Sequence, residues 1–219
     1  MTTNTKRRVK AVYQRLLLAY GPQRWWPADT PYEVCVGAIL TQSTSWANVE
    51  NAVANLKKAR LLSNDRILKT RNRRLAGLIR PSLYYNVKAR KLREFARFLA
   101  KEYGGRVENM ALEETGELRR KLLAVWGLGP ETADSMLLYA LDKPSFVVDA
   151  YTKRIFTRMG LIPADATYDE VKGFFETNLP RDARLYNEYH ALIVEHGKNT
   201  CKMTPRCKGC CLKAMCRSA

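Results

Sequence analysis

Apolar residues recur along the chain at the three- and four-residue spacing that is typical of amphipathic helices. The first pattern predicts a helix over residues 7–20, with an apolar face of Val9, Val12, Leu16, Leu17 and Tyr20. Further helices are expected over residues 31–40, 47–59 and 88–100, and residues 109–126 lead into a tight turn. The expected regular elements are therefore all helices.

The chain is organised around residues 122–158. Here an apolar helical end is followed by Gly127-Leu128-Gly129, and Pro130 suits the first turn of a second helix. The glycines permit a positive φ or the close approach of another backbone. A turn of this kind, beside a helix N-terminus with free N–H groups, can bind a phosphate without reading bases. An ordinary helical hairpin with a glycine turn is the alternative.

An apolar run and one carboxylate follow the second helix of this hairpin. Phe146-Val147-Val148 precedes Asp149, which opens another helical segment. An aspartate in this position commonly caps its helix. A carboxylate held beside an apolar wall can also stabilise positive charge on a deoxyribose or orient a water for attack. Asp149 is therefore a candidate catalytic residue as well as a candidate cap.

The net charge of the chain indicates what kind of molecule it binds. The 219 residues carry a formal net charge of +17, and the sequence pI is about 9.8. A basic surface favours a polyanion, with nucleic acid ahead of an anionic membrane. No apolar run approaches the roughly 18 residues of a membrane span, and the N-terminus lacks an apolar signal core. We expect a soluble cytoplasmic protein, associated with the nucleoid if the source is prokaryotic.

Five of the six cysteines lie near the C-terminus. Four of them have the spacing C-x5-C-x2-C-x5-C, namely Cys201, Cys207, Cys210 and Cys216, and Cys211 could replace Cys210. Thiols stay reduced in the cytosol, so the array predicts metal binding in preference to disulfides. Zinc and a [4Fe–4S] cluster both accept four thiolates. Spacing alone favours zinc.

The hairpin GLGPETA, the VVD segment that ends at Asp149 and the cysteine array together resemble the helix-hairpin-helix DNA glycosylases of the endonuclease III superfamily. The resemblance implies that Asp149 is essential for cleavage of the glycosidic bond. It also implies that the hairpin grips the DNA backbone through Gly127, Leu128, Gly129, Glu131 and Thr132. The family binds a [4Fe–4S] cluster through C-x6-C-x2-C-x5-C, and this chain is one residue shorter in the first gap. We therefore expect a structural cluster here, with zinc as the alternative.

Two further residues gain roles from the resemblance. The glutamine of the matching Q-x-T segment enters the gap left by a flipped base, which suggests this role for Gln42; a solvated loop amide is the alternative. Residues 79–89 resemble the segment that ends Y-N-x-K-A, where the residue before the tyrosine is an apolar wedge. That residue is Tyr84 here, and an aromatic ring could stack in the duplex and kink it.

The main departure from the family is chemical. Bifunctional members carry a lysine in the motif G-x-G-x-K-T-A, where it forms an imine with the sugar and cleaves the strand. Glu131 occupies that position in this chain. A carboxylate cannot form an imine, so we expect monofunctional hydrolysis that leaves an abasic site.

The combination of Trp25-Trp26-Pro27, LTQST followed by Trp46, and Glu131 in the hairpin is similar to the 3-methyladenine glycosylase branch. In that branch the W-W-P segment and the aromatic that matches Trp46 enclose the extruded base. An N-alkylated purine is positively charged and gains from stacking on electron-rich rings. The resemblance thus implies a base pocket of Trp25, Trp26, Pro27 and Trp46.

These observations lead to an all-α, two-lobed fold with the hairpin in residues 32–141 and the cysteine loop in a second lobe of residues 1–31 and 142–219. We expect a monomeric glycosylase that acts on double-stranded DNA with a damaged base. One alternative is a bifunctional enzyme with lyase activity on oxidised pyrimidines, and a uracil or thymine mismatch glycosylase is a near variant. A non-catalytic DNA-binding module with zinc is the remaining alternative.

Overall fold

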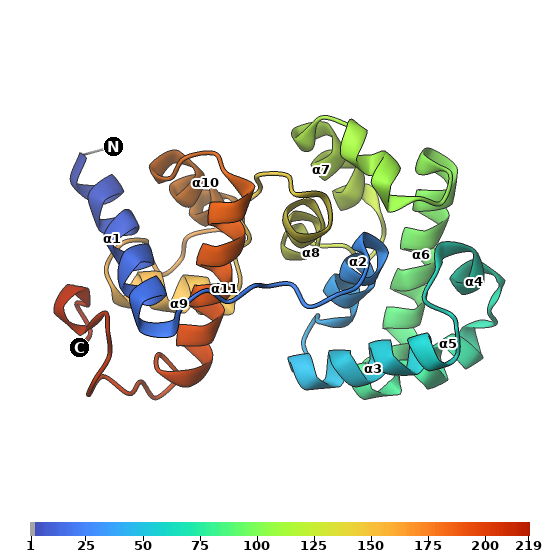
Figure 1. Cartoon of the computed structure of the whole chain (residues 1–219), viewed down its shortest axis with the longest axis horizontal. Helices are drawn as coiled ribbons and strands as arrows, with labels where there is room; N and C mark the ends of the chain where they lie inside the picture. Colours follow the sequence, from blue (N-terminus) through green and yellow to red (C-terminus); the bar gives the residue numbers. More distant parts are fainter. Residues whose placement is uncertain (1–2) are drawn as a thin grey trace. The chain divides into compact units, whose positions relative to one another are not determined.

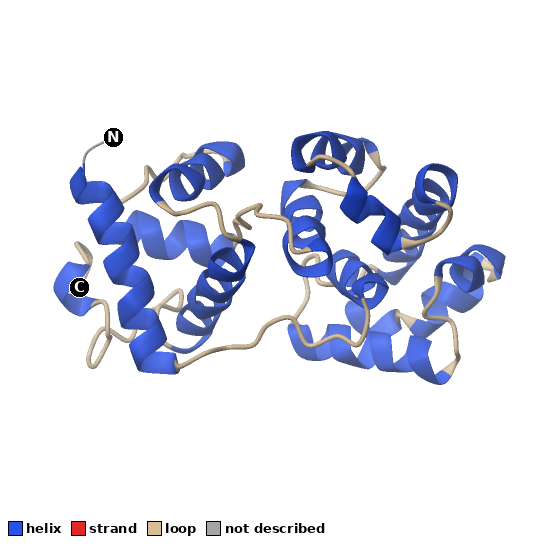
Figure 2. Cartoon of the chain, turned by 45° about the horizontal axis from the view of Figure 1, so that its top comes forward, coloured by secondary structure: helices blue, strands red, loops and turns tan. Residues whose placement is uncertain are grey.

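A computed structural model describes residues 3–219, and every regular element within this range is a helix (Figure 2). The all-α prediction is therefore confirmed for residues 3–219. The chain divides into two compact units, one of Trp26–Lys143 and the other of the residues up to Trp25 together with Pro144–Ala219. In this part of the chain, no helix is both long enough and apolar enough to span a membrane.

The unit of Trp26–Lys143 is built around one buried helix. It contains α2 (Pro31–Leu40), α3 (Trp46–Lys58), α4 (Asn64–Lys69), α5 (Asn72–Leu78), η1 (Arg80–Ser82), α6 (Tyr85–Tyr103), η2 (Val107–Leu112), α7 (Thr115–Ala124), α8 (Pro130–Ser135) and the π-helical turn η3 (Met136–Ala140). Helix α2 is buried from Glu33 to Leu40 and contacts α3, α6, α8 and η3 (Figure 1). A helix that is apolar on every side must lie inside its unit.

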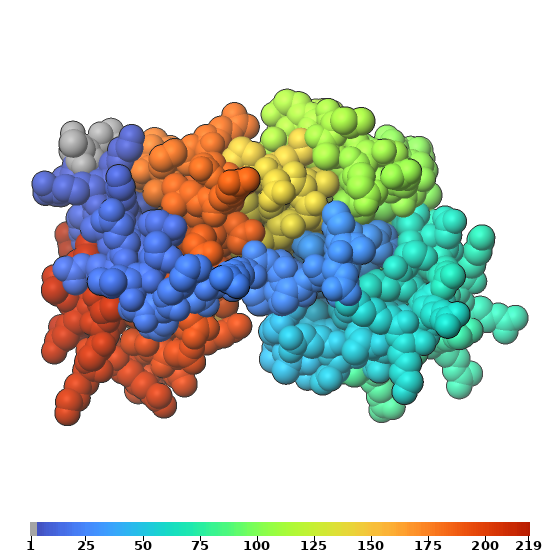
Figure 3. Space-filling view, viewed as in Figure 1, coloured from blue at the N-terminus to red at the C-terminus, as the bar shows by residue number. Residues whose placement is uncertain are grey.

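The other unit packs the N-terminal helix against helices from the last third of the chain. It contains α1 (Thr3–Tyr20), α9 (Ala150–Arg158), α10 (Tyr168–Asn178), α11 (Ala183–Asn199) and the short η4 (Lys213–Met215). Helix α1 packs against α10 and α11 (Figure 3), and Tyr189 Oη donates to Val9 O at 2.7 Å. The core is aromatic: Phe146 stacks on Phe175 with ring centroids 4.0 Å apart. This core fixes the extended run that leads to Asp149.

The predicted helices compare closely with the observed ones. The helix expected over residues 31–40 has these bounds, and that expected over residues 47–59 is displaced by one residue. Residues 109–126 do not lead into the hairpin as one element. Instead η2 ends at Leu112 and α7 starts after Glu114, whose carboxylate accepts from Gly116 N at 2.7 Å and caps the new helix.

A buried ion pair joins the two helices of the hairpin. Arg119 on α7 donates from Nε and Nη2 to the two carboxylate oxygens of Asp134 on α8, at 2.9 and 3.1 Å. Asp134 is fully buried, and the side chain of Arg119 is 20% exposed. The bidentate geometry fixes the angle at which α8 leaves the turn.

Replacing Arg119 should therefore destabilise the fold, because it leaves a buried carboxylate without its cation. We expect Arg119→Ala to lower the free energy of unfolding by about 3 kcal/mol, measured by urea denaturation. Arg120→Ala is the matched control, since Arg120 pairs with Glu117 on the surface, and its loss should be at most about 1 kcal/mol. Equal effects of the two substitutions would contradict this role of the buried pair.

Candidate functional site

Asp149 is the N-cap of α9, and its two oxygens have different partners. Oδ1 accepts from Thr152 N at 2.7 Å and from Thr152 Oγ1 at 2.8 Å. Oδ2 lies 3.6 Å from His190 Nε2 on α11. Asp149 therefore both caps α9 and keeps Oδ2 free of the cap. The two interpretations of this aspartate are compatible.

The surroundings keep the Asp149 carboxylate charged although only 11% of the side chain is exposed. Burial on its own raises the pKa of Asp149, but the nearby His190 ring, together with the two bonds from Thr152, more than offsets burial. The pKa of Asp149 consequently lies below its ordinary value of 3.8. The start of α9 adds a favourable dipole for an anion.

The run before Asp149 is held by side chains of α10. Phe146 N donates to Glu176 Oε1 at 2.9 Å, and Val148 N donates to Tyr168 Oη at 3.3 Å. Phe146, Val147 and Val148 are buried. The N–H groups of Phe146 and Val148 are thus satisfied by side chains of α10 in place of a neighbouring strand. Asp149 is thus anchored on both sides.

The hairpin turn has the backbone that its glycines permit. Gly127 has a φ of 86°, which a residue with a side chain adopts only with strain. A Cβ at Gly127 would also lie 2.6 Å from Cγ of Lys91, which packs on the turn. Leu128 points inward and is buried, whereas Glu131 is exposed. Of the predicted contact residues in the turn, Leu128 could therefore contact DNA only through its backbone.

Gln42 is bound to the hairpin. Its Nε2 donates to Thr132 Oγ1 at 2.8 Å and to Gly127 O at 3.3 Å, and Lys91 Nζ donates to its Oε1. Thr132 is buried, so its hydroxyl serves this contact. Gln42 is thus not a solvated loop amide: its side chain spans α6 and the hairpin. To enter a duplex, it would have to leave these partners.

Tyr84 lies at the tip of an exposed loop before α6. Leu83 and Tyr84 have φ values of 60° and 44°, and their side chains are 49% and 68% exposed. Residues other than glycine rarely adopt a positive φ, and here two adjacent residues do so. Lys88 fixes the loop from below, because its buried Nζ donates to Leu40 O at 2.8 Å and to Ser82 O. Burial, followed by the charge of Lys91, lowers the pKa of Lys88 to about 8.

Three of the four predicted base-pocket residues line one cavity of about 220 Å³: Trp26, Pro27 and Trp46. The rings of Trp26 and Trp46 meet edge to face, with centroids 5.0 Å apart. The ring of Tyr139 packs on that of Trp26, with centroids 5.2 Å apart. Trp25 does not line the cavity, and its ring lies 6.0 Å from the ammonium group of Lys198. In this conformation the two rings contact each other and no third ring fits between them.

A carboxylate also lines this cavity. Glu33 is buried, and its side chain lies 2.6 Å from Lys57 Nζ and accepts from Asp29 N at 3.1 Å. Trp26 packs on Gly37, where a Cβ would lie 3.1 Å from Cζ2 of the ring. The cavity therefore combines aromatic rings with the ion pair of Glu33 and Lys57, and Glu50 also lines it.

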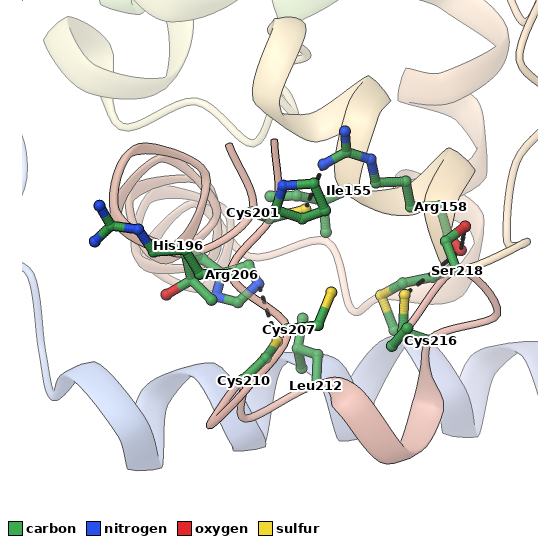
Figure 4. A pocket seen from close by; sticks show the side chains of 14 residues that line it. Ile155, Arg158, His196, Cys201, Arg206, Cys207, Cys210, Leu212, Cys216 and Ser218 are labelled. Carbon is green, nitrogen blue, oxygen red and sulfur yellow. Dashed lines mark hydrogen bonds between the residues drawn. The ribbon is translucent and has the colours of Figure 1, made fainter. Parts of the chain in front are cut away.

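The four predicted metal ligands line a single pocket (Figure 4), namely Cys201, Cys207, Cys210 and Cys216. Cys211 does not line it. Arg158 Nη1 lies 3.3 Å from the sulfur of Cys201. Among residues 3–219, no group of three or more His, Cys, Asp or Glu side chains is arranged to hold a metal ion. The donor set is four thiols around one pocket, and four thiolates can hold either zinc or a [4Fe–4S] cluster.

The site residues are divided between the two units. Asp149 and the four cysteines belong to the unit with both chain ends, as does Trp25. The remaining predicted residues belong to the unit of Trp26–Lys143, and they are Trp26, Pro27, Gln42, Trp46, Tyr84, Gly127, Leu128, Gly129, Glu131 and Thr132. The hairpin, Gln42 and Lys91 are joined directly by hydrogen bonds and packing.

Several residues of the site carry no local sequence signal. His190 and Tyr139 lie on helical apolar faces and are indistinguishable there from core residues. Lys91 is one of several basic residues on α6, and Glu33 is one of two acidic residues in α2 and α3. Only the packing of distant helices brings His190 to Asp149 and Lys91 to Gln42.

Comparison with known proteins places this geometry in a family. Residues 36–181 match the model of the HhH-GPD superfamily base excision DNA repair proteins. A Methanocaldococcus jannaschii protein named as a candidate DNA repair glycosylase is 51% identical over the full length of both chains. Endonuclease III of Thermotoga maritima is 32% identical over 85% of this chain and 82% of its own.

Solved structures agree on the fold. The 3-methyladenine DNA glycosylase of H. pylori bound to 1,N6-ethenoadenine has a TM-score of 0.75 and 31% identity, covering 89% of this chain and 97% of that chain. A trapped endonuclease III–DNA covalent intermediate has a TM-score of 0.85 at 22% identity, covering 100% of this chain and 97% of that chain.

Because His190 lies close to Asp149, it should lower the pKa of the Asp149 carboxyl, and titration can measure this change. Carbon-13 NMR of the Asp149 carboxyl should give a midpoint below 3.8 in the wild type and a higher midpoint in His190→Gln. A depressed pKa contributes stability above the ordinary value, and this contribution is lost as the pH falls through the folded-state value. An unchanged midpoint in His190→Gln would show that His190 does not act on the carboxylate.

Proposed function

The chain belongs to the HhH-GPD superfamily of base excision repair DNA glycosylases, and we propose that it releases alkylated purines such as 3-methyladenine by monofunctional hydrolysis. It would act as a monomer on double-stranded DNA with a damaged base, in the cytoplasm or nucleoid. The observation that carries the proposed chemistry is a buried, charged carboxylate at the start of α9, with one oxygen outside its capping bonds.

Asp149 acts electrostatically in the proposed mechanism. Loss of the base leaves an oxocarbenium-like sugar, whose positive charge a nearby carboxylate stabilises. Oδ1 keeps its bonds to Thr152 and fixes the orientation of the group, while Oδ2 is available to the sugar or to a water molecule. Since the pKa of Asp149 is lowered, the carboxylate is already charged at neutral pH. Water then attacks the sugar and completes hydrolysis.

Glu131 supports a reaction without strand cleavage. The position that holds lysine in the bifunctional motif is an exposed carboxylate here, which cannot form an imine with the sugar. The N-glycosidic bond of an alkylated purine is already weakened by its positive charge. Hydrolysis with one carboxylate and no covalent intermediate is therefore chemically sufficient.

The cavity beside Trp26 and Trp46 supports an alkylated purine as substrate. Electron-rich rings attract a cationic base. The carboxylates of Glu33 and Glu50 lie in the same wall, where Glu33 is paired with Lys57. One tryptophan ring would turn from its edge-to-face contact to receive the base. The 31% identity to a 3-methyladenine glycosylase, whose structure contains 1,N6-ethenoadenine, points to the same class of lesion.

The hairpin, Gln42 and Tyr84 form the proposed DNA-binding surface. The turn offers backbone N–H groups to a phosphate, and exposed Tyr84 enters the duplex as a wedge. Gln42 then exchanges its bonds with Thr132 and Gly127 for contacts in the gap that the base leaves. Extrusion of a base costs a few kcal/mol, which stacking in the pocket offsets.

The second candidate is a bifunctional enzyme for oxidised pyrimidines. It is favoured by the 32% identity to endonuclease III and by Lys91. Burial lowers the pKa of Lys91, which lies against the hairpin turn. An amine with a lowered pKa is a better nucleophile for imine formation. Strand breakage without alkali would favour this second candidate.

A [4Fe–4S] cluster is the proposed occupant of the cysteine pocket. In such a cluster each thiolate binds a different iron atom, whereas zinc gathers four ligands on one atom. Cys201, Cys207, Cys210 and Cys216 surround a pocket and fit the first arrangement. The cluster, where bound, supplies a structural crosslink and no step of base excision. It would brace an exposed basic loop that carries Lys202, Arg206, Lys208 and Lys213.

The substrate and the reaction type can be tested together. Duplexes that contain 3-methyladenine, thymine glycol, a U·G pair or a T·G pair are incubated with the protein, and strand breaks are measured with and without alkali. Because Glu131 cannot form an imine, we expect breaks on the alkylated duplex only after alkali. Breaks on thymine glycol without alkali, together with a borohydride-trapped adduct, would contradict the proposed reaction.

The cysteine pocket predicts which of two adjacent thiols binds iron. We expect anaerobically purified protein to have broad visible absorbance and to contain iron and inorganic sulfide. Cys210→Ser should lose most of the iron, since Cys210 lines the pocket, whereas Cys211→Ser should retain it. If iron is retained in Cys210→Ser and lost in Cys211→Ser, the ligand is Cys211 and not Cys210. Zinc without sulfide would contradict the cluster.

A further inference from the structure

An arginine on α6 is stacked on an exposed tryptophan immediately before the hairpin turn. The guanidinium carbon of Arg90 lies 3.9 Å from the centroid of the Trp126 ring. Trp126 is 45% exposed and directly precedes Gly127. Trp126 thus presents its ring at the surface, with the guanidinium of Arg90 over it.

Arg90 differs from the other basic residues of α6 between positions 88 and 101. Lys88 and Arg93 donate to backbone carbonyls, and Lys91 donates to Gln42. Arg97 and Lys101 pair with Glu94 and Glu102. Within the described residues, Arg90 makes no hydrogen bond or ion pair, and its contact is the stacking on Trp126. Its five N–H donors therefore remain available to an outside acceptor.

The contact with Trp126 restricts the positions that these donors can take. A guanidinium has its N–H groups at the edge of its plane, where two of them can bind a phosphate together. Cation–π attraction holds the group in this position with about 0.5–1 kcal/mol at an exposed site. Arg90 also loses less side-chain entropy on binding, since the ring already restricts it.

The location fits the duplex backbone. Lys91, the next residue, packs on Gly127, so Arg90 and Lys91 lie beside consecutive residues of the turn. Tyr84, Val87 and Lys91 follow one another at helical spacing, so the exposed wedge and the turn are joined along α6. Tyr84 and Val87 are both exposed.

We propose that Arg90, positioned by Trp126, forms a second phosphate-binding site beside the hairpin. The site rests on the proposed function, because it takes duplex DNA as the partner. The hairpin offers backbone N–H groups to one phosphate, and Arg90 binds another with its side chain. Trp126 is a positioning residue, which acts through Arg90.

The salt dependence of binding tests this site. Affinity for a lesion-free duplex is measured by fluorescence anisotropy at several salt concentrations for the wild type, Arg90→Ala, Trp126→Ala, Trp126→Phe and the double variant Arg90→Ala/Trp126→Ala. Loss of one phosphate contact should reduce the slope of log K against log salt by about 0.9. We expect this reduction in Arg90→Ala, a smaller reduction in Trp126→Ala, and the wild-type slope in Trp126→Phe. The double variant should match Arg90→Ala.

Arg97→Ala is the control, since it removes the same charge from the same helix but from a residue that is paired with Glu94. It should keep the wild-type slope. An Arg90→Ala slope equal to that of the wild type, or additive losses in the double variant, would overturn the site. Base release by the wild type, measured in parallel, separates the two proposals: release with an unchanged Arg90→Ala slope rejects this site alone. Binding without release rejects the proposed function alone.

Discussion

The Asp149 carboxylate is almost excluded from water and is nevertheless charged. Its charge depends on groups that come from two helices. Thr152, one turn into α9, binds one oxygen, and His190 on α11 approaches the other. Burial without these groups would favour the neutral acid. The crossing of α9 and α11 must therefore be close, and Gly197 permits it, because a Cβ there would lie 2.4 Å from the ring of Tyr151.

The hairpin depends on polar contacts in the same way. Asp134, Thr132 and Gln42 would each be costly to bury alone, and each has a specific partner. Arg119 fixes the angle between α7 and α8, and Gln42 ties the turn to the end of α2. These contacts hold the backbone of the turn in one conformation before any DNA is bound. Preorganisation of this kind reduces the ordering cost of binding.

Local sequence signals predicted the helices whose apolar spacing is regular. The helix expected over residues 31–40 has the observed bounds, whereas the one expected over residues 88–100 is three residues longer at each end in the structure. The cap on α9 was equally visible, because an aspartate precedes a helical pattern. The short helices α4 and α5 have too few turns for a clear pattern, and a capping carboxylate interrupts the segment before the hairpin at Glu114.

Contacts between distant residues could not be read from the sequence. His190 and Asp149 are 41 positions apart, and Lys91 and Gln42 are 49 apart. Their pairing follows from how helices pack, which composition and spacing do not encode. The resemblance to a family supplied the expected role of Gln42 but not its hydrogen bonds to the hairpin. The edge-to-face contact of Trp26 and Trp46 was likewise inaccessible from the sequence.

The central claim is that the Asp149 carboxylate stabilises the sugar as the base leaves. Its most direct test is the single-turnover rate of free 3-methyladenine release from a duplex, compared between wild type and Asp149→Asn at equal occupancy of the DNA. The amide keeps the capping geometry but carries no charge. We expect release to fall by several orders of magnitude while the affinity for DNA is retained. Release at the wild-type rate in Asp149→Asn would contradict the account.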